Sequence, residues 1–189
     1  MASVRRRAKK RAVFLDRDGV VIREVSYLRR PGQVRLISGS ASGIARLRRA
    51  GFKVVLATNQ SGVGRGYLTL RTLGRIHRLL QRRLAREGAR LDGLYFCPHL
   101  PAAAGGKPCS CRKPGLGMLL RASRRLHLDL ARSYFVGDST TDMLTARRAG
   151  CTAVLVRTGK GGRDGIYRVR PHRACRNLAA AAAWILKSS

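Results

Sequence analysis

The sequence predicts an α/β fold, a three-layer Rossmann-like architecture whose mainly parallel sheet carries helices on both faces. Short apolar runs rich in β-branched residues alternate along the chain with longer stretches of helical periodicity. The apolar runs show no strict alternation of polar and apolar residues, so each is expected to be buried on both faces. A chain of 189 residues with 44% hydrophobic residues fits a single domain, residues 1–189, with a real core.

Five strands and five helices are predicted in alternation. The expected strands are Ala12–Asp16, Phe52–Thr58, Gly93–Cys97, Tyr134–Gly137 and Thr152–Val156. The expected helices are Ser40–Ala50, Thr69–Glu87, Gly117–His127, Thr140–Ala149 and Leu178–Leu186. In the second helix, leucine and isoleucine recur every three or four residues, and arginines fill the opposite face. Gly51 and Gly150 follow two of the helices, where a left-handed cap is expected.

Groups that can do chemistry gather where the predicted strands end. Asp16 and Thr58 end two of these strands, Asp138 directly follows a third, and Cys97 ends a fourth. Ligands of open parallel sheets bind beyond the carboxyl ends of the strands. We therefore expect the functional site at this edge of the sheet, on a fold without a large cap domain.

The first strand leads into Asp16-Arg17-Asp18-Gly19. Two carboxylates with this spacing can divide the labour of phosphoryl transfer, since one can attack phosphorus. The other can protonate the leaving alcohol and then activate water. Such a pair also favours a hard dication such as Mg²⁺. A turn whose aspartates only cap backbone amides explains the same residues, so the motif alone leaves both interpretations open.

Four segments in order resemble the signatures of the haloacid dehalogenase superfamily of phosphatases. They are Asp16-x-Asp18-Gly19 after a strand, Thr58 at the end of the next strand, Lys113, and Gly137-Asp138-Ser139-x-x-Asp142. The resemblance implies a catalytic set of Asp16, Asp18, Thr58 and Lys113. It also implies Mg²⁺ bound by Asp16, Asp18 and Asp138. Asp142 is interpreted as a residue that orients the site, with a solvated charge at a helix start as the alternative.

The proline-rich segment 97–114 is expected to be one loop that binds zinc. It contains Cys97, His99, Cys109 and Cys111, and three thiolates with one imidazole form a closed structural Zn²⁺ set. The odd total of five cysteines argues for a reducing compartment and against a disulfide framework. The alternative interpretation is that these four residues bind no metal. Cys151 and Cys175 are expected to be buried small residues.

The zinc segment narrows the resemblance to one branch of the superfamily. Cys97-Pro98-His99 and Cys109-x-Cys111-Arg112-Lys113-Pro114 resemble the D-glycero-D-manno-heptose 1,7-bisphosphate 7-phosphatases and the related histidinol-phosphate phosphatases. The segments 58–66 and 154–160 are more similar to the heptose enzymes, although Ser26 and Ser139 depart from their pattern.

This resemblance implies Mg²⁺-dependent hydrolysis of the 7-phosphate through an aspartyl-phosphate intermediate, for the nucleotide-heptose pathway of surface polysaccharides. Hydrolysis of histidinol phosphate is the alternative. The resemblance further implies that the small-molecule sugar phosphate contacts nine residues: Glu24, Val25, Ser26, Tyr27, Asn59, Gln60, Ser61, Arg112 and Ser139.

The composition is unusual in its large positive net charge. Lys and Arg number 40 against nine Asp and Glu, which gives a net charge of +31. Such a surface is expected to bind polyanions non-specifically. One explanation of the arginines is that they lie on solvated helix faces. The alternative is a surface that binds nucleic acid, as in a nucleic-acid 3′-phosphatase or a non-catalytic nucleic-acid-binding protein. An aromatic content of only 5% argues against a stacking platform for bases.

No membrane segment is predicted. Residues 1–11 form a basic N-terminal extension, and the apolar run behind them is too short for a signal peptide. The longest apolar stretch, Leu178–Leu186, is far shorter than the roughly 20 residues of a membrane span. We expect a cytoplasmic monomer. His77, His127 and His172 are expected to lie at the surface or to pack between helices, without a partner that the sequence identifies.

Overall fold

The computed structural model describes residues 8–188, and these residues form one six-stranded sheet in which all neighbouring strands are parallel. The strands are β1 (Ala12–Leu15), β2 (Lys53–Asn59), β3 (Gly93–Cys97), β4 (Tyr134–Gly137), β5 (Thr152–Val156) and β6 (Arg173–Cys175). Their order across the sheet is β3-β2-β1-β4-β5-β6. The predicted parallel sheet is confirmed. Most of the predicted basic extension, residues 1–7, lies outside the described residues.

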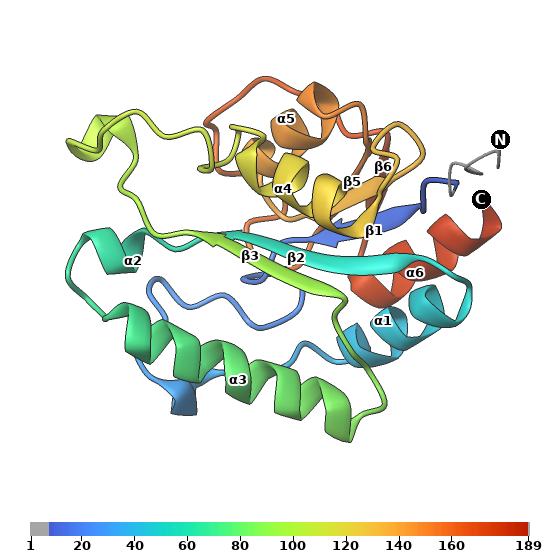
Figure 1. Ribbon diagram of the computed structural model, residues 1–189, viewed down its shortest axis with the longest axis horizontal. Helices are drawn as coiled ribbons and strands as arrows, with labels where there is room; N and C mark the ends of the chain where they lie inside the picture. Colours follow the sequence, from blue (N-terminus) through green and yellow to red (C-terminus); the bar gives the residue numbers. More distant parts are fainter. Residues whose placement is uncertain (1–7, 189) are drawn as a thin grey trace, which may run out of the picture.

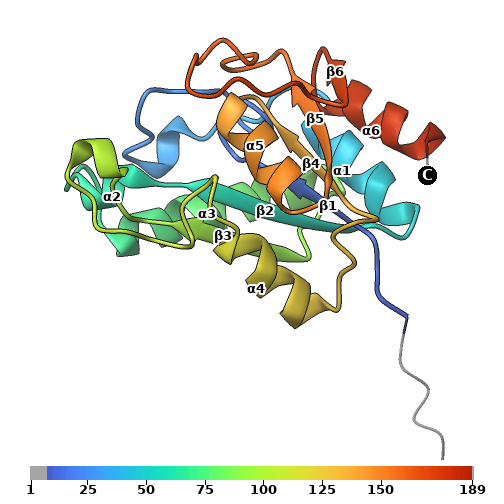
Figure 2. The same cartoon turned by 90° about the horizontal axis from the view of Figure 1, so that it is seen from above.

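Helices cover both faces of this sheet (Figures 1 and 2). They are α1 (Ser40–Arg49), α2 (Ser61–Gly64), α3 (Leu70–Arg86), α4 (Gly117–Leu126), α5 (Thr140–Arg148) and α6 (Leu178–Lys187). Helices α1, α3 and α6 pack on one face, and α4 and α5 pack on the other. The three-layer architecture expected from the sequence is therefore confirmed, and residues 8–188 include no separate cap domain.

Alternate residues of the four central strands, β1, β2, β4 and β5, face the two apolar layers. In β1, Val13 and Leu15 pack toward α1, α3 and α6, whereas Ala12 and Phe14 pack toward α4 and α5. All four side chains are fully buried. A strand buried on both faces cannot alternate apolar with polar residues, which explains the unbroken apolar runs in the sequence.

The chain order places a crevice at the end of β1. From β1 the chain continues to β2 and β3 on one side, and then returns to β4 on the other side of β1. Connections that leave in opposite directions open a binding crevice beyond the strand ends at this switch point. The backbone N–H of Asp16 donates to the carbonyl of Val136 at 3.0 Å, so the residues that follow β1 and β4 begin side by side.

Several short elements were missed, and some predicted boundaries were wrong by one residue. Strand β6 has only three residues, two of them exposed, and pairs with β5 without an apolar run of its own. Helix α2 has four residues with two glycines, so it carries no helical periodicity. The segment predicted as one loop contains a 3₁₀ turn, Ala102–Ala104, and another occurs at Pro31–Gln33. Strand β1 ends at Leu15 and β2 spans Lys53–Asn59.

None of the helices in residues 8–188 combines the length and the apolar character that crossing a membrane requires.

Candidate functional site

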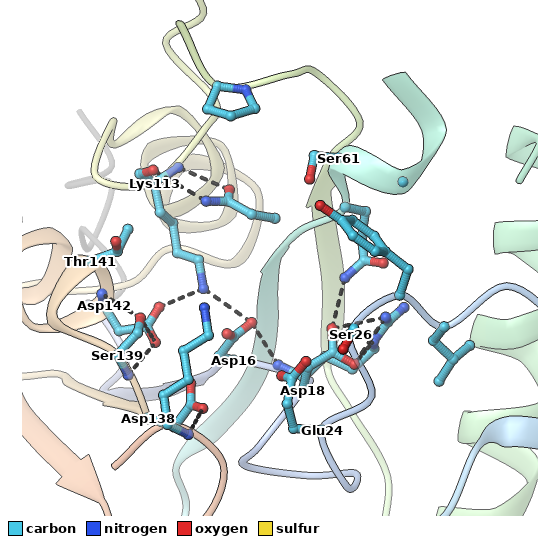
Figure 3. Close-up of a pocket in the computed structure, with 18 of the residues that line it drawn as sticks. Asp16, Asp18, Glu24, Ser26, Ser61, Lys113, Asp138, Ser139, Thr141 and Asp142 are labelled. Atoms are coloured by element: carbon cyan, nitrogen blue, oxygen red, sulfur yellow. Dashed lines mark hydrogen bonds and ion pairs between the residues drawn. The ribbon is translucent and has the colours of Figure 1, made fainter. Parts of the chain in front are cut away.

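Asp16 is the first residue after β1, and its carboxylate faces the crevice (Figure 3). Its Oδ1 accepts the backbone N–H of Arg17 at 2.7 Å and lies 3.0 Å from Nζ of Lys113. Within residues 8–188, no hydrogen bond is made to Oδ2 of Asp16. One carboxylate oxygen is thus fixed in place while the other is open toward the crevice.

Lys113 connects Asp16 with Asp142. Its Nζ donates to Oδ1 of Asp142 at 2.6 Å, and the side chains of both residues are buried. Burial alone would lower the pKa of Lys113, but the carboxylates of Asp142 and Asp16 raise it above its ordinary value. Lys113 therefore stays a cation inside the protein. The side chain of Asn59, at the end of β2, accepts from the backbone N–H of Lys113 and donates to its carbonyl, which fixes the position of the lysine.

Asp142 is fully buried, so the interpretation as a solvated charge at a helix start was wrong. Its Oδ2 accepts from both the backbone N–H and the hydroxyl of Ser139, the residue that caps α5. Asp142 thus ties Lys113 to the first turn of α5 and fixes the cation beside Asp16.

Asp138, the first residue after β4, lies in a narrow cradle of backbone. A Cβ atom at Gly19 or at Gly159 would collide with Oδ2 of Asp138, so both positions require glycine. The same Oδ2 accepts the backbone N–H of Lys160 at 2.7 Å. Burial and the neighbouring carboxylates of Asp16 and Asp142 raise the pKa of Asp138 to about 8.

The acidic cluster fits a hard divalent cation. Carboxylate oxygens of Asp16, Asp138 and Asp142 lie within 4.8 Å of one another. Lys113 pairs with both Asp142 and Asp16, so this one ammonium faces a cluster of three carboxylates. Oxygen ligands of this kind suit Mg²⁺. Of the three predicted Mg²⁺ residues, the structure groups Asp16 with Asp138, whereas the carboxylate of Asp18 lies outside this cluster.

The carboxylate of Asp18 is held from two sides. Nε and Nη2 of Arg17 donate to it over 2.9–3.1 Å. On the other side, Nε2 of Gln60 donates to Oδ2 of Asp18 at 3.0 Å and to Oγ1 of Thr58 at 2.9 Å. The two predicted catalytic residues Asp18 and Thr58 are therefore bridged by a residue predicted to bind substrate.

Arg17 and His77 are parts of this site that the sequence did not reveal. Arg17 is only 1% exposed, and its Nη1 lies 3.3 Å from Nε2 of His77, on α3. The sequence identified no partner for His77, and the expectation that it packs against helices is confirmed, since it is buried on α3. A signal existed, because His77 lies on the buried stripe of α3 formed by Leu73, Ile76 and Leu80. A polar residue on an apolar helix face needs a buried partner.

These groups open into a pocket of about 280 Å³. All nine predicted substrate residues line it: Glu24, Val25, Ser26, Tyr27, Asn59, Gln60, Ser61, Arg112 and Ser139. Asp16, Asp18, Lys113 and Asp138 line it as well, together with Arg65 and Lys160, which the sequence analysis did not select. Burial and the carboxylate of Asp18 raise the pKa of Glu24 to about 7.

The four predicted zinc ligands come together beside this pocket. Sγ of Cys97 lies 3.5 Å from Nδ1 of His99 and 3.8 Å from Sγ of Cys109, and Sγ of Cys111 lies 3.5 Å from the same nitrogen. Two further edges of the cluster, between Cys109 and Cys111 and between His99 and Cys109, are shorter, at 2.8 and 2.9 Å. Sulfur ligands at the corners of a zinc tetrahedron lie about 3.8 Å apart. Three of these edges are close to those of a zinc tetrahedron and two are shorter, so the donor set, more than its exact spacing, fits Zn²⁺.

The thiols of this cluster differ in acidity. Burial raises the pKa of Cys97. For Cys109, burial opposes ionisation, but hydrogen bonds from Cys111 and from two backbone N–H groups together lower its pKa to about 6. At least one ligand is therefore ready to lose its proton near neutral pH, as metal binding requires.

Comparison with known proteins agrees with the geometry. A family model of HAD-hydrolase-like proteins matches residues 110–181. The chain is 44% identical over 185 residues to a D-glycero-D-manno-heptose-1,7-bisphosphate 7-phosphatase of Thermosynechococcus vestitus, covering 92% of this chain and 94% of that protein. It is 41% identical to the D-glycero-beta-D-manno-heptose-1,7-bisphosphate 7-phosphatase of Bordetella bronchiseptica, over 94% of this chain and 98% of that protein.

A solved structure is equally similar. The D,D-heptose 1,7-bisphosphate phosphatase of B. bronchiseptica, complexed with magnesium and phosphate, superposes with a TM-score of 0.86 at 40% identity. The match covers 95% of this chain and 99% of that one.

Proposed function

This chain belongs to the family of D-glycero-D-manno-heptose-1,7-bisphosphate 7-phosphatases, and we propose that it removes the 7-phosphate of a heptose 1,7-bisphosphate. It is a phosphoric monoester hydrolase that depends on Mg²⁺. The observation that carries the proposal is the arrangement of Asp16, whose Oδ1 is fixed by Lys113 and by a backbone N–H while Oδ2 is open toward the pocket. The roles of individual residues below are parts of this proposal.

In the first step, Oδ2 of Asp16 attacks phosphorus, and the bond between phosphorus and the sugar oxygen breaks. Asp18 gives its proton to that oxygen, so the sugar leaves as a neutral alcohol. Asp16 then carries the phosphoryl group as an acyl phosphate. In the second step, Asp18 takes a proton from water, the water oxygen attacks phosphorus, and inorganic phosphate leaves Asp16.

Lys113 and Thr58 are assigned to the oxygens of the phosphoryl group. The buried ammonium of Lys113 lies 3.0 Å from Asp16, where negative charge develops during the transfer. Thr58 is buried at the end of β2, and its hydroxyl can donate to a phosphoryl oxygen while it accepts from Gln60. Fixed donors at this point cost little reorganisation when the bond breaks.

The proposed metal ligands are chosen by which oxygen and sulfur atoms the structure brings together. We assign carboxylate ligands for Mg²⁺ to Asp16 and Asp138, and a main-chain contribution to Asp18, because its carboxylate is engaged by Arg17 and Gln60. Held by these residues, Mg²⁺ would supply Lewis-acid chemistry to the phosphoryl transfer. A structural Zn²⁺ is assigned to Cys97, His99, Cys109 and Cys111. It would order the segment that carries Arg112 and Lys113.

The substrate residues are assigned to the sugar side of the pocket. Glu24, Val25, Ser26 and Tyr27 come from one loop, and Asn59, Gln60 and Ser61 come from the end of β2 and the start of α2. Arg112 and Ser139 complete the set, and Arg112 is a cation suited to the phosphate that is not hydrolysed. Their common position around Asp16 and Lys113 supports this assignment.

Three wider properties are also proposals. The charge of +31 supports weak, salt-dependent binding of polyanions. Free thiolates need a reducing compartment, which supports a cytoplasmic location. We propose that the protein acts as a monomer, because one chain supplies Asp16, Asp18 and Lys113 to the crevice and Thr58 directly behind Gln60.

The experiment is phosphate release with Mg²⁺ from heptose 1,7-bisphosphate in both anomeric forms, histidinol phosphate and a 3′-phosphorylated oligonucleotide. The Asp16→Asn protein is the blank. Preference for the bisphosphate supports the proposal if NMR of the product shows that the 7-phosphate was removed first. Preference for histidinol phosphate would move the protein to the neighbouring branch, and turnover of the oligonucleotide alone would reject the sugar substrate.

A further inference from the structure

We propose that Arg17 and His77 are positioning residues that hold the carboxylate of Asp18 where it exchanges protons with the leaving group and with water. The inference deepens the proposed function, because it rests on Asp18 as the acid and base of that reaction. It concerns how one side chain is oriented, and it applies to any phosphate ester that this site cleaves.

The contact between Arg17 and Asp18 fixes the carboxylate plane. Nε of Arg17 lies 3.1 Å from Oδ1 of Asp18, and Nη2 lies 3.0 Å from Oδ1 and 2.9 Å from Oδ2. A guanidinium bound edge-on to a carboxylate restricts both its position and its rotation. Asp18 keeps 18% of its side chain exposed toward the pocket, whereas the side chain of Arg17 is 1% exposed. The arginine is thus the buried anchor of a carboxylate that reaches solvent and substrate.

His77 completes the anchor from a different part of the fold. Nη1 of Arg17 lies 3.3 Å from Nε2 of His77, 60 residues later in the chain. A guanidinium has only donors, so Nε2 of His77 must be the acceptor. The ring is therefore neutral and carries its proton on Nδ1. Burial and the charge of Arg17 lower the pKa of His77 to about 3, which agrees with this assignment.

The ring of His77 is itself fixed. Helix α3 carries it on its buried side, and the ring lies 5.5 Å, centroid to centroid, from Phe96 of β3. The orientation of Asp18 is thus set by a chain of contacts that runs from β3 and α3 through Arg17. Gln60 restrains the other side of the same carboxylate.

A purely structural role for His77 makes a different prediction from a positioning role. Loss of packing would lower stability and would slow all substrates by a similar factor. If Asp18 lost its orientation, the first turnover would slow only for substrates whose leaving group needs a proton. p-Nitrophenolate leaves as a stabilised anion without a proton donor, whereas the alkoxide of an alkyl phosphate needs one.

The test compares first-turnover rates of p-nitrophenyl phosphate, phenyl phosphate and glycerol phosphate, all with Mg²⁺. His77→Phe keeps a ring that can pack against Phe96 but removes the acceptor. His77→Gln replaces the ring but offers an amide oxygen to Arg17. Leu80→Ala is the matched control, because it removes a fully buried side chain one turn further along α3, outside this contact chain. The melting temperature of each variant verifies that it is folded.

We expect His77→Phe to slow glycerol phosphate by ~10-fold to ~100-fold while p-nitrophenyl phosphate stays within about threefold of wild type. Phenyl phosphate should fall between them, and His77→Gln should recover most of the loss. Leu80→Ala should lower the melting temperature and leave the ratio of the rates unchanged. An unchanged ratio in His77→Phe, or equal losses in His77→Phe and His77→Gln, would overturn the proposal. These probes do not depend on the heptose substrate, so failure of that substrate assignment would appear separately, in the phosphate-release panel.

Discussion

Replacing Asp142 with asparagine removes the main partner of a buried lysine. Lys113 lies 2.6 Å from Asp142 and 3.0 Å from Asp16, and the side chains of Lys113 and Asp142 are 2% and 0% exposed. Breaking one partner of a buried ion pair costs about 3–5 kcal/mol of folding free energy. Because Asp16 remains as a second carboxylate, we expect the lower end, about 3 kcal/mol. For a domain of this size that is about 6–12 °C in melting temperature.

The activity of the same variant should also fall. Without Asp142, Lys113 keeps Asp16 as its only ion-pair partner within residues 8–188. It is then drawn toward Asp16, the proposed nucleophile, and away from the proposed position of the phosphoryl oxygens. We expect first-turnover rates to fall by ~10-fold to ~100-fold, since a displaced electrostatic donor costs about this much. Urea unfolding measures the stability and rapid quench measures the rate.

A matched control is available at the first turn of the same helix. Asp164 accepts from the backbone N–H and hydroxyl of Thr140, at 2.8 and 2.9 Å, near the start of α5. Asp164→Asn weakens only a capping contact and should cost about 1 kcal/mol or less. If Asp142→Asn and Asp164→Asn lower the stability by the same small amount, the reasoning on the buried lysine is refuted.

Three further outcomes follow from the geometry. Asp16→Asn should lose at least ~10⁴-fold in turnover while its melting temperature and zinc content stay unchanged, and residual activity within tenfold of wild type would remove Asp16 as the nucleophile. Below pH 6.5 the unfolded chain protonates His77 while the folded protein, with a pKa of about 3, does not; stability is therefore lost as pH falls, by about 3 kcal/mol at pH 4.5. Comparing urea unfolding of wild type with His77→Gln isolates this contribution, and equal slopes against pH would contradict it. Cys109→Ser should lower the zinc content measured by mass spectrometry and increase proteolysis within residues 97–114, while far-UV circular dichroism of the sheet persists; full zinc binding by this variant would count against the assigned ligand set.

The sequence was most informative where apolar runs end in polar residues. Asp16 and Asp138 each follow such a run, and a parallel sheet aligns the carboxyl ends of its strands, so their approach could be predicted without coordinates. Spacing also grouped the four proposed zinc ligands, because cysteine and histidine pairs separated by one residue in a proline-rich segment have few other roles. The structure brings both groups together.

Contacts that depend on packing between distant elements could not be predicted. Arg17 and His77 are 60 residues apart in the chain. No local sequence pattern specifies which residue of α3 lies next to the residue that follows Asp16. Strand β6 depends on pairing with β5, because its own three residues include no apolar run. The burial of Asp142 follows from the position of Lys113, which the zinc segment delivers from elsewhere in the chain.

The most direct test of the mechanism uses Asp18→Asn with p-nitrophenyl phosphate and Mg²⁺. The first step does not need a proton for this leaving group, and the second step lacks its base, so the enzyme should stop as a phosphoenzyme. The account predicts a rapid release of one equivalent of p-nitrophenolate per enzyme, followed by slow turnover. Mass spectrometry of the acid-quenched protein should then find the phosphoryl group on Asp16. Absence of the burst, or a phosphoryl group on another residue, would contradict nucleophilic catalysis by Asp16.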